Sequence, residues 1–397
     1  MAVYVLAEPV LTSLVDLSNH SVPTDAMHAI GNESHDLIKG IQKLEALCID
    51  TTLPSLPKFV VVGDQSAGKS SIIEAICDIK LPRGPGTCTR CPFQITTSSA
   101  KTATWTAKVS LHFKHEYDPS FKAGGISTRY ERWPEQHLRV FDFAATQDKE
   151  MLDDILKRAQ LAILNPQLTP EHFFEPKLAH QKAAVPFSPN VVSLEIEGPN
   201  LPELSFFDLP GAINMHENAS EQHLVPFIEK LVKNYLRDEQ TLVLLAISAN
   251  VDTETSTAFR FVLQCKALGR CMGVLTKPDL LGRDRHSHVR RLLNGEIFQL
   301  GNGWFITKQL SHDEMDEHTI PTHAEARERE KQFFGGQPWS GSLAGFAERF
   351  GVPNLQAAVC TLHTFSPRPP ADLYSIAGLP EAHSTHPQRA AGDHRAR

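Results

Sequence analysis

An eight-residue segment constrains the fold of this chain more than any other part of the sequence. Residues 63–70 read GDQSAGKS and fit the pattern GxxxxGK[ST] without a mismatch. The segment follows an apolar run at 58–62 that is typical of a buried strand, and it precedes a helical stretch beginning at Ser71. A strand, a glycine-rich turn and a helix in this order predict a phosphate-binding loop at a helix N-terminus. A glycine-rich turn formed by chance is the alternative, and the flanking elements argue against it.

The chemistry of a phosphate site assigns roles within this loop. The glycines let backbone N–H groups wrap the phosphates, the Lys69 ammonium supplies positive charge to the β and γ phosphates, and the Ser70 hydroxyl can bind Mg²⁺. The nucleotide-binding residues expected here are Gly63, Asp64, Ser66, Ala67, Gly68, Lys69, Ser70 and Ser71.

A second fragment, DLPG at 208–211, follows the apolar run 204–207. Asp208 therefore lies at the carboxyl end of a predicted strand, where open α/β sheets bind ligands, and it can reach Mg²⁺ through water. The backbone N–H of Gly211 can contact the γ-phosphate and sense its loss. Alone this fragment is a weak signal, but in order after a phosphate loop it indicates a nucleotide switch.

A third fragment, TKPD at 276–279, follows the predicted strand 272–275. This fragment is expected to determine which nucleotide base binds. The Asp279 carboxylate can accept hydrogen bonds from the ring N–H and amino group of guanine, whereas adenine offers no such pair of donors. Thr276, Lys277 and Asp279 are therefore expected to contact GTP or GDP, and an ATPase is the disfavoured alternative. A plain N-cap before a helix at 280–295 is compatible with this role.

Strands alternate with helices along the chain. Further apolar runs at 191–196 and 242–247 read as strands, and helical patterns follow at 225–236 and 257–268. This order predicts an α/β fold with a mainly parallel central sheet flanked by helices, as in P-loop nucleoside triphosphatases. Between about 100 and 190 the pattern weakens, apart from a helical stretch at 149–164, which we interpret as an insertion.

We divide the 397 residues into five segments: a loose arm (1–32), an amphipathic helix (33–57), the nucleotide-binding domain (58–310), a helical flanking segment (311–362) and a tail (363–397). The flanking segment holds a charged helix near 322–334 and a second amphipathic stretch near 343–350. The tail has no apolar periodicity, so we expect it to be disordered.

Composition excludes several functional classes. Lysine plus arginine (39) against aspartate plus glutamate (46) gives a net charge of −7, which offers no basic footprint for nucleic acid. Seven cysteines, an odd number, do not indicate a disulfide framework, and the lone pair Cys88 and Cys91 lacks a second pair for zinc. No secretory signal or membrane-spanning run is evident, so we expect a cytoplasmic protein.

The three fragments, with LPRGPGTCTRCP at 81–92 between the first two, resemble the dynamin superfamily, including its Mx-like branch. The run ANVD at 249–252 resembles a fifth family element, and the match covers roughly residues 33–362. The resemblance implies a GTPase whose full-length relatives remodel membranes or act on organelles. Some of these relatives would bind peripherally to organelle membranes. Contact with membranes or the cytoskeleton, microtubules included, would need stalk regions that are not recognisable in this sequence.

The resemblance also implies catalytic roles. Gln65 and Thr89 would position the attacking water, with Thr89 a further Mg²⁺ ligand. Ser66 and the backbone of Gly84 and Gly86 would hold a monovalent cation, Na⁺ or K⁺, against the developing phosphate charge. Asp252 would act across a transient dimer of two GTPase domains, so hydrolysis would be stimulated by pairing.

The sequence departs from the family pattern at two places near the site. Pro85 stands where the family usually has serine, which stiffens the loop. Thr307 and Lys308 stand about where relatives use asparagine and arginine near the base, which makes Lys308 a candidate base contact. The alternative to a GTP hydrolase is a GTP-binding interaction module that does not hydrolyse.

Overall fold

The computed structural model describes residues 58–82, 88–100, 104–120, 132–175, 182–199, 201–214, 222–310, 314 and 322–365. The expected arm, the expected helix at 33–57 and the expected tail beyond Phe365 lie outside these residues, as do Gly84, Pro85 and Gly86. Within the described part of the chain, no helix is long and apolar enough to cross a membrane.

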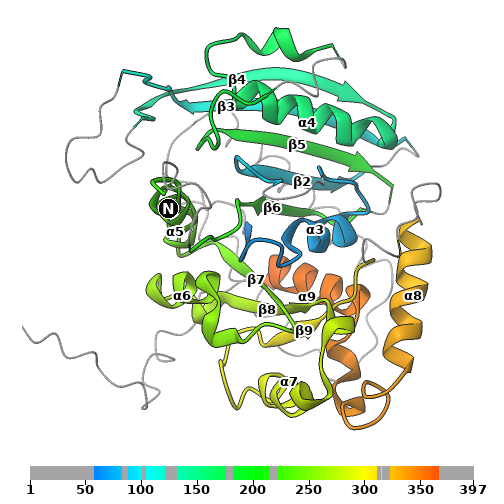
Figure 1. The fold of residues 1–397 in the computed structure, drawn as a ribbon. Helices are drawn as coiled ribbons and strands as arrows, with labels where there is room; N and C mark the ends of the chain where they lie inside the picture. The colour runs from blue at the N-terminus through cyan, green and yellow to red at the C-terminus, as the bar shows by residue number, and fades with distance from the viewer. Residues whose placement is uncertain are drawn as a thin grey trace, which may run out of the picture.

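The described strands form one nine-stranded sheet in the order β4-β3-β5-β2-β6-β1-β7-β8-β9. Figure 1 shows this order, with β4 at the top of the view and β9 near the bottom. The strands are β1 (Phe59–Gly63), β2 (Phe93–Ser99), β3 (Thr106–His115), β4 (Glu135–Thr146), β5 (Val191–Gly198), β6 (Leu204–Asp208), β7 (Leu242–Ser248), β8 (Cys271–Thr276) and β9 (Trp304–Ile306).

The sheet is mainly parallel, as predicted. β6, β1, β7, β8 and β9 run parallel to one another, and β2 is parallel to β5. Antiparallel pairing joins β2 to β6, and β3 to both β4 and β5. Residues 104–175 thus contribute β3, β4 and a helix beside them, and they extend one edge of the sheet.

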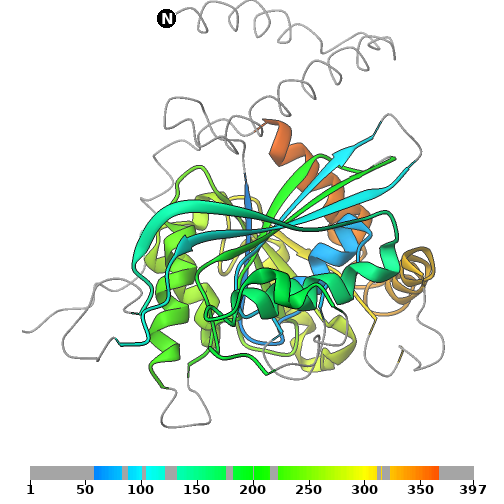
Figure 2. The ribbon, with the colours of Figure 1, turned by 90° about the horizontal axis from the view of Figure 1, so that it is seen from above.

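The longer helices of the described chain surround the sheet, and all but one of them cover its two faces. They are α3 (Lys69–Cys77), α4 (Leu152–Ile163), α5 (Leu224–Leu236), α6 (Thr257–Gln264), α7 (His286–Leu293), α8 (His323–Gly335) and α9 (Val352–Phe365). Side chains of α3, α4 and α9 join one buried core, and those of α5, α6 and α7 join another. β1 contributes side chains to both cores, because Phe59 and Val61 lie in the first core and Val60 and Val62 lie in the second. Figure 2 shows the helices on the two sides of the twisted sheet.

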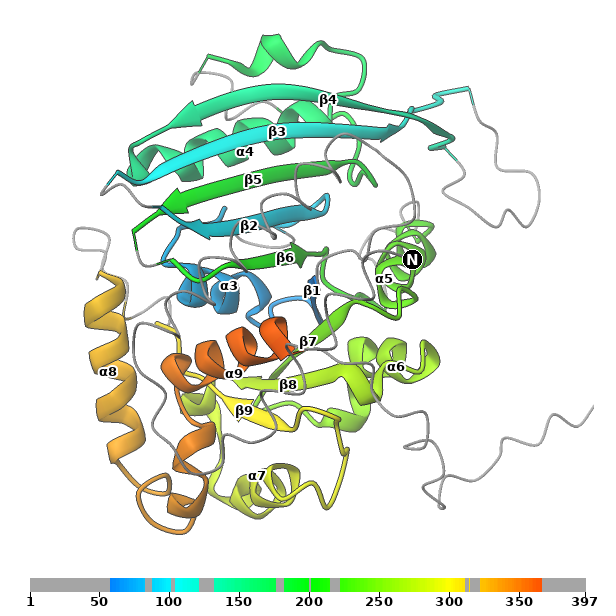
Figure 3. The ribbon, with the colours of Figure 1, turned by 180° about the vertical axis from the view of Figure 1, so that it is seen from behind.

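α8 stands at the side of the molecule, away from the sheet (Figures 1 and 3). Its N-terminus carries a capping box of Thr322 and Glu325, and only Glu330 in this helix is buried. The Glu330 carboxylate accepts hydrogen bonds from the Lys308 and Val352 amides at 2.7 and 2.8 Å. α8 therefore docks through a buried carboxylate that joins the end of β9 to the start of α9.

Some helix boundaries differ from the sequence prediction. The helix predicted at 257–268 ends at Gln264, and a 3₁₀ turn, Leu268–Arg270, follows. The helix predicted at 280–295 is shorter, because two 3₁₀ turns, Pro278–Leu280 and Arg283–Arg285, precede α7. The amphipathic stretch near 343–350 contains a 3₁₀ helix, Ala344–Arg349. In each case local turns compete with a continued α-helix.

Gly273 lies in β8 directly beside Trp304 of β9, and a Cβ built on Gly273 would overlap the buried indole ring. We expect Gly273→Ala to lower the free energy of unfolding by about 1–3 kcal/mol, because overpacking a closed core forces side chains or backbone to move. Chemical denaturation measures this difference. Gly269→Ala is the control, since its Cβ would meet no heavy atom within 4 Å; equal stability of the two variants would contradict the packing argument.

Candidate functional site

The phosphate loop connects the end of β1 to the start of α3, at the edge where the parallel strands end. A Cβ on Gly63 would lie 2.6 Å from the Ala246 carbonyl oxygen of β7, so the strand pairing leaves space for glycine alone. Gly68, the N-cap of α3, has φ 85°, a left-handed conformation that glycine adopts without strain. These two glycines shape the turn that exposes the N-terminus of α3.

Thr276, at the end of β8, supports this loop from behind. Its hydroxyl donates to the Ala67 carbonyl at 2.8 Å, and a Cβ on Gly68 would lie 3.3 Å from the Thr276 methyl group. The first residue of TKPD therefore buttresses the phosphate loop. The fragment expected to bind the phosphates and the fragment expected to bind the base are thus joined through Thr276.

Lys69 is buried and folds back over the loop. Its ammonium donates to the carbonyl oxygens of Gly63 and Asp64 at 3.3 and 3.2 Å. Burial lowers the pKa of Lys69, and the negative charges of Asp208 and Asp64 oppose this shift. The ammonium is therefore held against the loop by carbonyl groups of the loop itself.

Asp208, the last residue of β6, is the centre of the site. Its Oδ2 accepts hydrogen bonds from the Ser70 hydroxyl at 2.7 Å and the Thr89 hydroxyl at 3.0 Å. Its Oδ1 is buried and has no hydrogen-bond partner within the described residues. Burial raises the pKa of Asp208, while the Lys69 charge and the two hydroxyl bonds act in the opposite direction.

An unpartnered carboxylate oxygen beside two hydroxyl groups fits a divalent cation. Mg²⁺ prefers oxygen ligands and a small number of carboxylates, and Ser70, Thr89 and Asp208 supply that donor set. The structure thus brings Asp208 together with Ser70 and Thr89, which lie 138 and 119 positions before it in the sequence.

The DLPG segment is tied to the phosphate loop by backbone hydrogen bonds. The Gln65 amide donates to the Ala212 carbonyl at 3.2 Å, and the Ala212 amide donates to the Gly63 carbonyl at 3.1 Å. A Cβ on Gly211 would lie 2.9 Å from Gln65 Cα and 3.1 Å from Lys69 Nζ. The two segments therefore lie so close that only glycine fits at 211.

Other loop residues divide between ligand-facing and internal positions. Gln65 and Ser66 are exposed, with Ser66 at φ 61°, and Ala67 is buried. Ser71 is half-buried in the first turn of α3. The Asp64 carboxylate accepts from the Ala258 amide of α6 at 3.1 Å, a tertiary contact that the sequence analysis did not foresee.

The TKPD fragment ends in a 3₁₀ turn that carries Asp279 on the surface. Lys277, which precedes this turn, adopts a left-handed conformation with φ 53°. The Ala249 amide donates to the Thr276 carbonyl at 2.8 Å, so the run 249–252 begins beside the same strand end. Asp279 is thus accessible to a ligand at the edge formed by β7 and β8.

Asp252 and Lys308, two residues implied by family resemblance, both have partners. The exposed Asp252 carboxylate pairs with Arg285 at 2.8 Å. The Lys308 ammonium, whose side chain is 8% exposed, pairs with Glu314 at 2.8 Å and lies 5.8 Å from the Phe333 ring centroid. Thr307 is buried and its amide donates to the Leu275 carbonyl. Neither partner, Arg285 nor Glu314, carried a recognisable signal in the sequence.

Comparison with known proteins identifies similar chains. The sequence profile described as Dynamin family matches residues 59–278, more than half of the chain. Interferon-induced GTP-binding protein Mx2 of Oncorhynchus mykiss is 28% identical over 296 residues, which is 74% of this chain and 39% of the relative. Interferon-induced GTP-binding protein Mx of Solea senegalensis is 30% identical over 295 residues, 74% of this chain and 40% of the relative. The chain spans about two fifths of the length of these curated relatives.

The raised pKa of Asp208 predicts a pH effect on the chain without nucleotide or divalent metal. The folded chain keeps a proton that the unfolded chain releases, so the free energy of unfolding should fall as the pH rises above about 4, the ordinary aspartate range. Asp208→Asn removes this titration and should flatten that fall. Thermal unfolding in chelator measures it, with the exposed Asp284→Asn as control; identical slopes for wild type and Asp208→Asn would contradict the argument.

Proposed function

Because the chain belongs to the dynamin family, we propose that it binds GTP and hydrolyses it to GDP and phosphate. The observation that carries this proposal is the Asp208 carboxylate, which accepts hydrogen bonds from the hydroxyls of Ser70 and Thr89 and keeps one buried oxygen for which the described residues offer no partner. The Mx relatives are named GTP-binding proteins, which supports the choice of nucleotide.

In this proposal the phosphate loop binds the triphosphate. Backbone N–H groups of residues 68–70, at the N-terminus of α3, face the phosphates, and Lys69 moves its ammonium from the carbonyl groups of Gly63 and Asp64 to phosphate oxygens. The negative charge of the phosphates then replaces these two hydrogen bonds, and its attraction offsets the free-energy cost of burying the Lys69 ammonium. Gly211 contributes its amide to the γ-phosphate and links the DLPG segment to the bound state.

Ser70, Thr89 and Asp208 would hold Mg²⁺, and the ion would supply positive charge that neutralises the phosphates during transfer. For the hydrolytic water we propose Gln65 and Thr89 as the orienting residues. Gln65 is exposed in the phosphate loop, and the Thr89 hydroxyl lies beside Asp208. Ser66 would contact a monovalent cation, together with Gly84 and Gly86 outside the described residues.

Base selection is assigned to Asp279, supported by Thr276 and Lys277. The exposed carboxylate at the end of β8 can accept hydrogen bonds from both donors on the guanine edge. We also propose that Lys308 contacts the base. Its ammonium or its aliphatic stem would touch the ligand while the ammonium stays beside Glu314.

We also propose that two GTPase domains pair transiently. Asp252 is exposed near the site, and its partner Arg285 also donates to the Val251 carbonyl at 3.1 Å. We propose that Asp252 exchanges Arg285 for a contact across the dimer. A role in membrane remodelling or on microtubules stays a prediction from the sequence, because none of the described residues tests it.

We expect GTP to bind at least about 100-fold more tightly than ATP, because a site built for two donors rejects a base that lacks them. Asp279→Asn should shift the preference toward xanthine nucleotides, since the amide can donate to the carbonyl oxygen that replaces the amino group. Calorimetric titration measures both. Asp284→Asn, an exposed neighbour, should bind like the wild type, and equal wild-type affinity for ATP and GTP would refute the assignment.

We expect the turnover per molecule to rise with protein concentration at saturating GTP, because pairing completes the site. Asp252→Ala should remove this dependence while GTP affinity stays nearly unchanged, and the exposed Glu254→Ala should behave like the wild type. Steady-state phosphate release across a hundredfold range of about micromolar concentrations measures it. Binding of GTP without release at any concentration would favour the non-hydrolysing interaction module instead.

A further inference from the structure

A glutamine on α4 brackets Thr89 on both sides. Gln160 Nε2 donates to the Cys88 carbonyl at 2.9 Å, and Gln160 Oε1 accepts from the Arg90 amide at 2.8 Å. A primary amide offers an NH₂ donor and a carbonyl acceptor, so this orientation alone satisfies both backbone partners. One side chain therefore holds the peptide groups before and after Thr89.

The residue between these two bonds is the threonine that reaches Asp208. Thr89 is buried, and its hydroxyl donates to Asp208 Oδ2 at 3.0 Å. The Arg90 carbonyl also accepts from the Ser188 amide at 3.1 Å. Because a short side chain follows its backbone, fixing the peptides around Thr89 fixes the direction of its hydroxyl.

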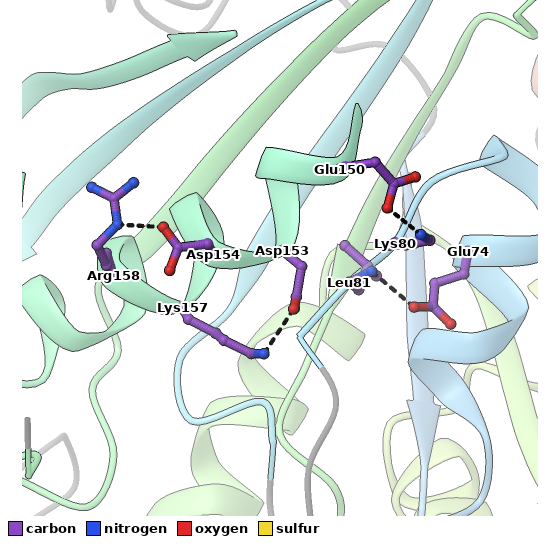
Figure 4. Close-up of polar contacts among 8 residues, drawn as sticks. All are labelled: Glu74, Lys80, Leu81, Glu150, Asp153, Asp154, Lys157 and Arg158. Carbon is purple, nitrogen blue, oxygen red and sulfur yellow. Dashed lines mark hydrogen bonds and ion pairs between the residues drawn. The ribbon is translucent and has the colours of Figure 1, made fainter. Parts of the chain in front are cut away.

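The apolar face of α4, including Leu152, Leu156 and Ala159, packs in the core and fixes the position of the helix. Figure 4 shows two ion pairs along the side of its first turns, Lys157 with Asp153 and Arg158 with Asp154.

Two contacts fasten α4 to its surroundings. Arg158 donates to the Phe174 carbonyl at 2.7 Å. Just before the helix, Glu150 pairs with Lys80, which lies near the end of α3. The Gln160 amide therefore contacts the backbone around Thr89 from a helix that is itself held in place.

We propose that Gln160 is a positioning residue for hydrolysis, which holds the backbone around Thr89 so that its hydroxyl meets Asp208, the metal and the attacking water. This inference rests on the proposed function. Gln160 acts through Thr89, and the phosphate loop and Asp279 belong to other elements. Its loss should therefore lower the catalytic rate and spare nucleotide affinity.

Gln160→Leu replaces the amide with a branched apolar side chain one atom shorter and removes both hydrogen bonds. We expect kcat to fall by about 10- to 100-fold, the range that small misplacements of a catalytic group produce, with GDP affinity within about twofold of the wild type. Gln160→Glu keeps the acceptor for the Arg90 amide and loses the donor to Cys88, so it should lie between. Lys157→Leu, one turn earlier on α4, is the matched control and should leave kcat unchanged.

A double-mutant cycle separates positioning from a general role in holding α4. If Gln160 acts through Thr89, Gln160→Leu should change the rate by less than about twofold once Thr89→Ala is present. Single-turnover reactions with enzyme in excess can follow these slow rates. If the fall in rate is the same in both backgrounds, or if Gln160→Leu turns over GTP like the wild type, the inference is wrong.

The same experiment distinguishes this failure from failure of the proposed function. A wild-type chain that hydrolyses GTP while Gln160→Leu is unaffected overturns the positioning role alone. A wild-type chain that binds GTP and never hydrolyses it overturns the proposed hydrolysis, and the inference falls with it. Circular dichroism and thermal unfolding of both Gln160 variants establish that they are folded, and a folded Gln160→Glu suffices if Gln160→Leu is not.

Discussion

Strand β1 is the constraint on which the rest of the structure depends. All five of its residues are buried, and it pairs in parallel with β6 on one side and β7 on the other. Because parallel strands end at the same edge, the phosphate loop after Gly63 and the carboxylate of Asp208 must emerge side by side. The chemistry of the site therefore follows from an apolar strand that contains no functional side chain.

The sequence was sufficient where one run of residues carries its own signal. β1, β7 and β8 are continuous runs of buried residues, as strands buried on both faces should be. β5 and β6 contain polar residues but keep enough apolar ones at 191–196 and 204–207 to be recognised, so all five strands were predicted. β2, β3 and β4 escaped prediction, because polar residues interrupt them and most of β4 is exposed at the sheet edge. β9 has three residues, too few to establish a period.

The site divides in the same way. The three fragments around Lys69, Asp208 and Asp279 could be recognised because each is contiguous and its spacing follows from its chemistry. The contacts that hold them could not, since they join residues far apart in the chain: Asp64 with Ala258, Thr276 with Ala67, and Gln160 with both neighbours of Thr89. The environment of Lys308 depends likewise on Glu314 and on the docking of α8.

The phosphate loop is a junction between the two hydrophobic cores. On one side α3 packs with α9, where Gln356 donates to the Ile76 carbonyl, and on the other the Asp64 carboxylate holds the first turn of α6. A local opening of this loop would have to disturb helices on both faces. Although it lies at the surface, the loop should therefore resist local opening more than a surface turn that contacts one core alone.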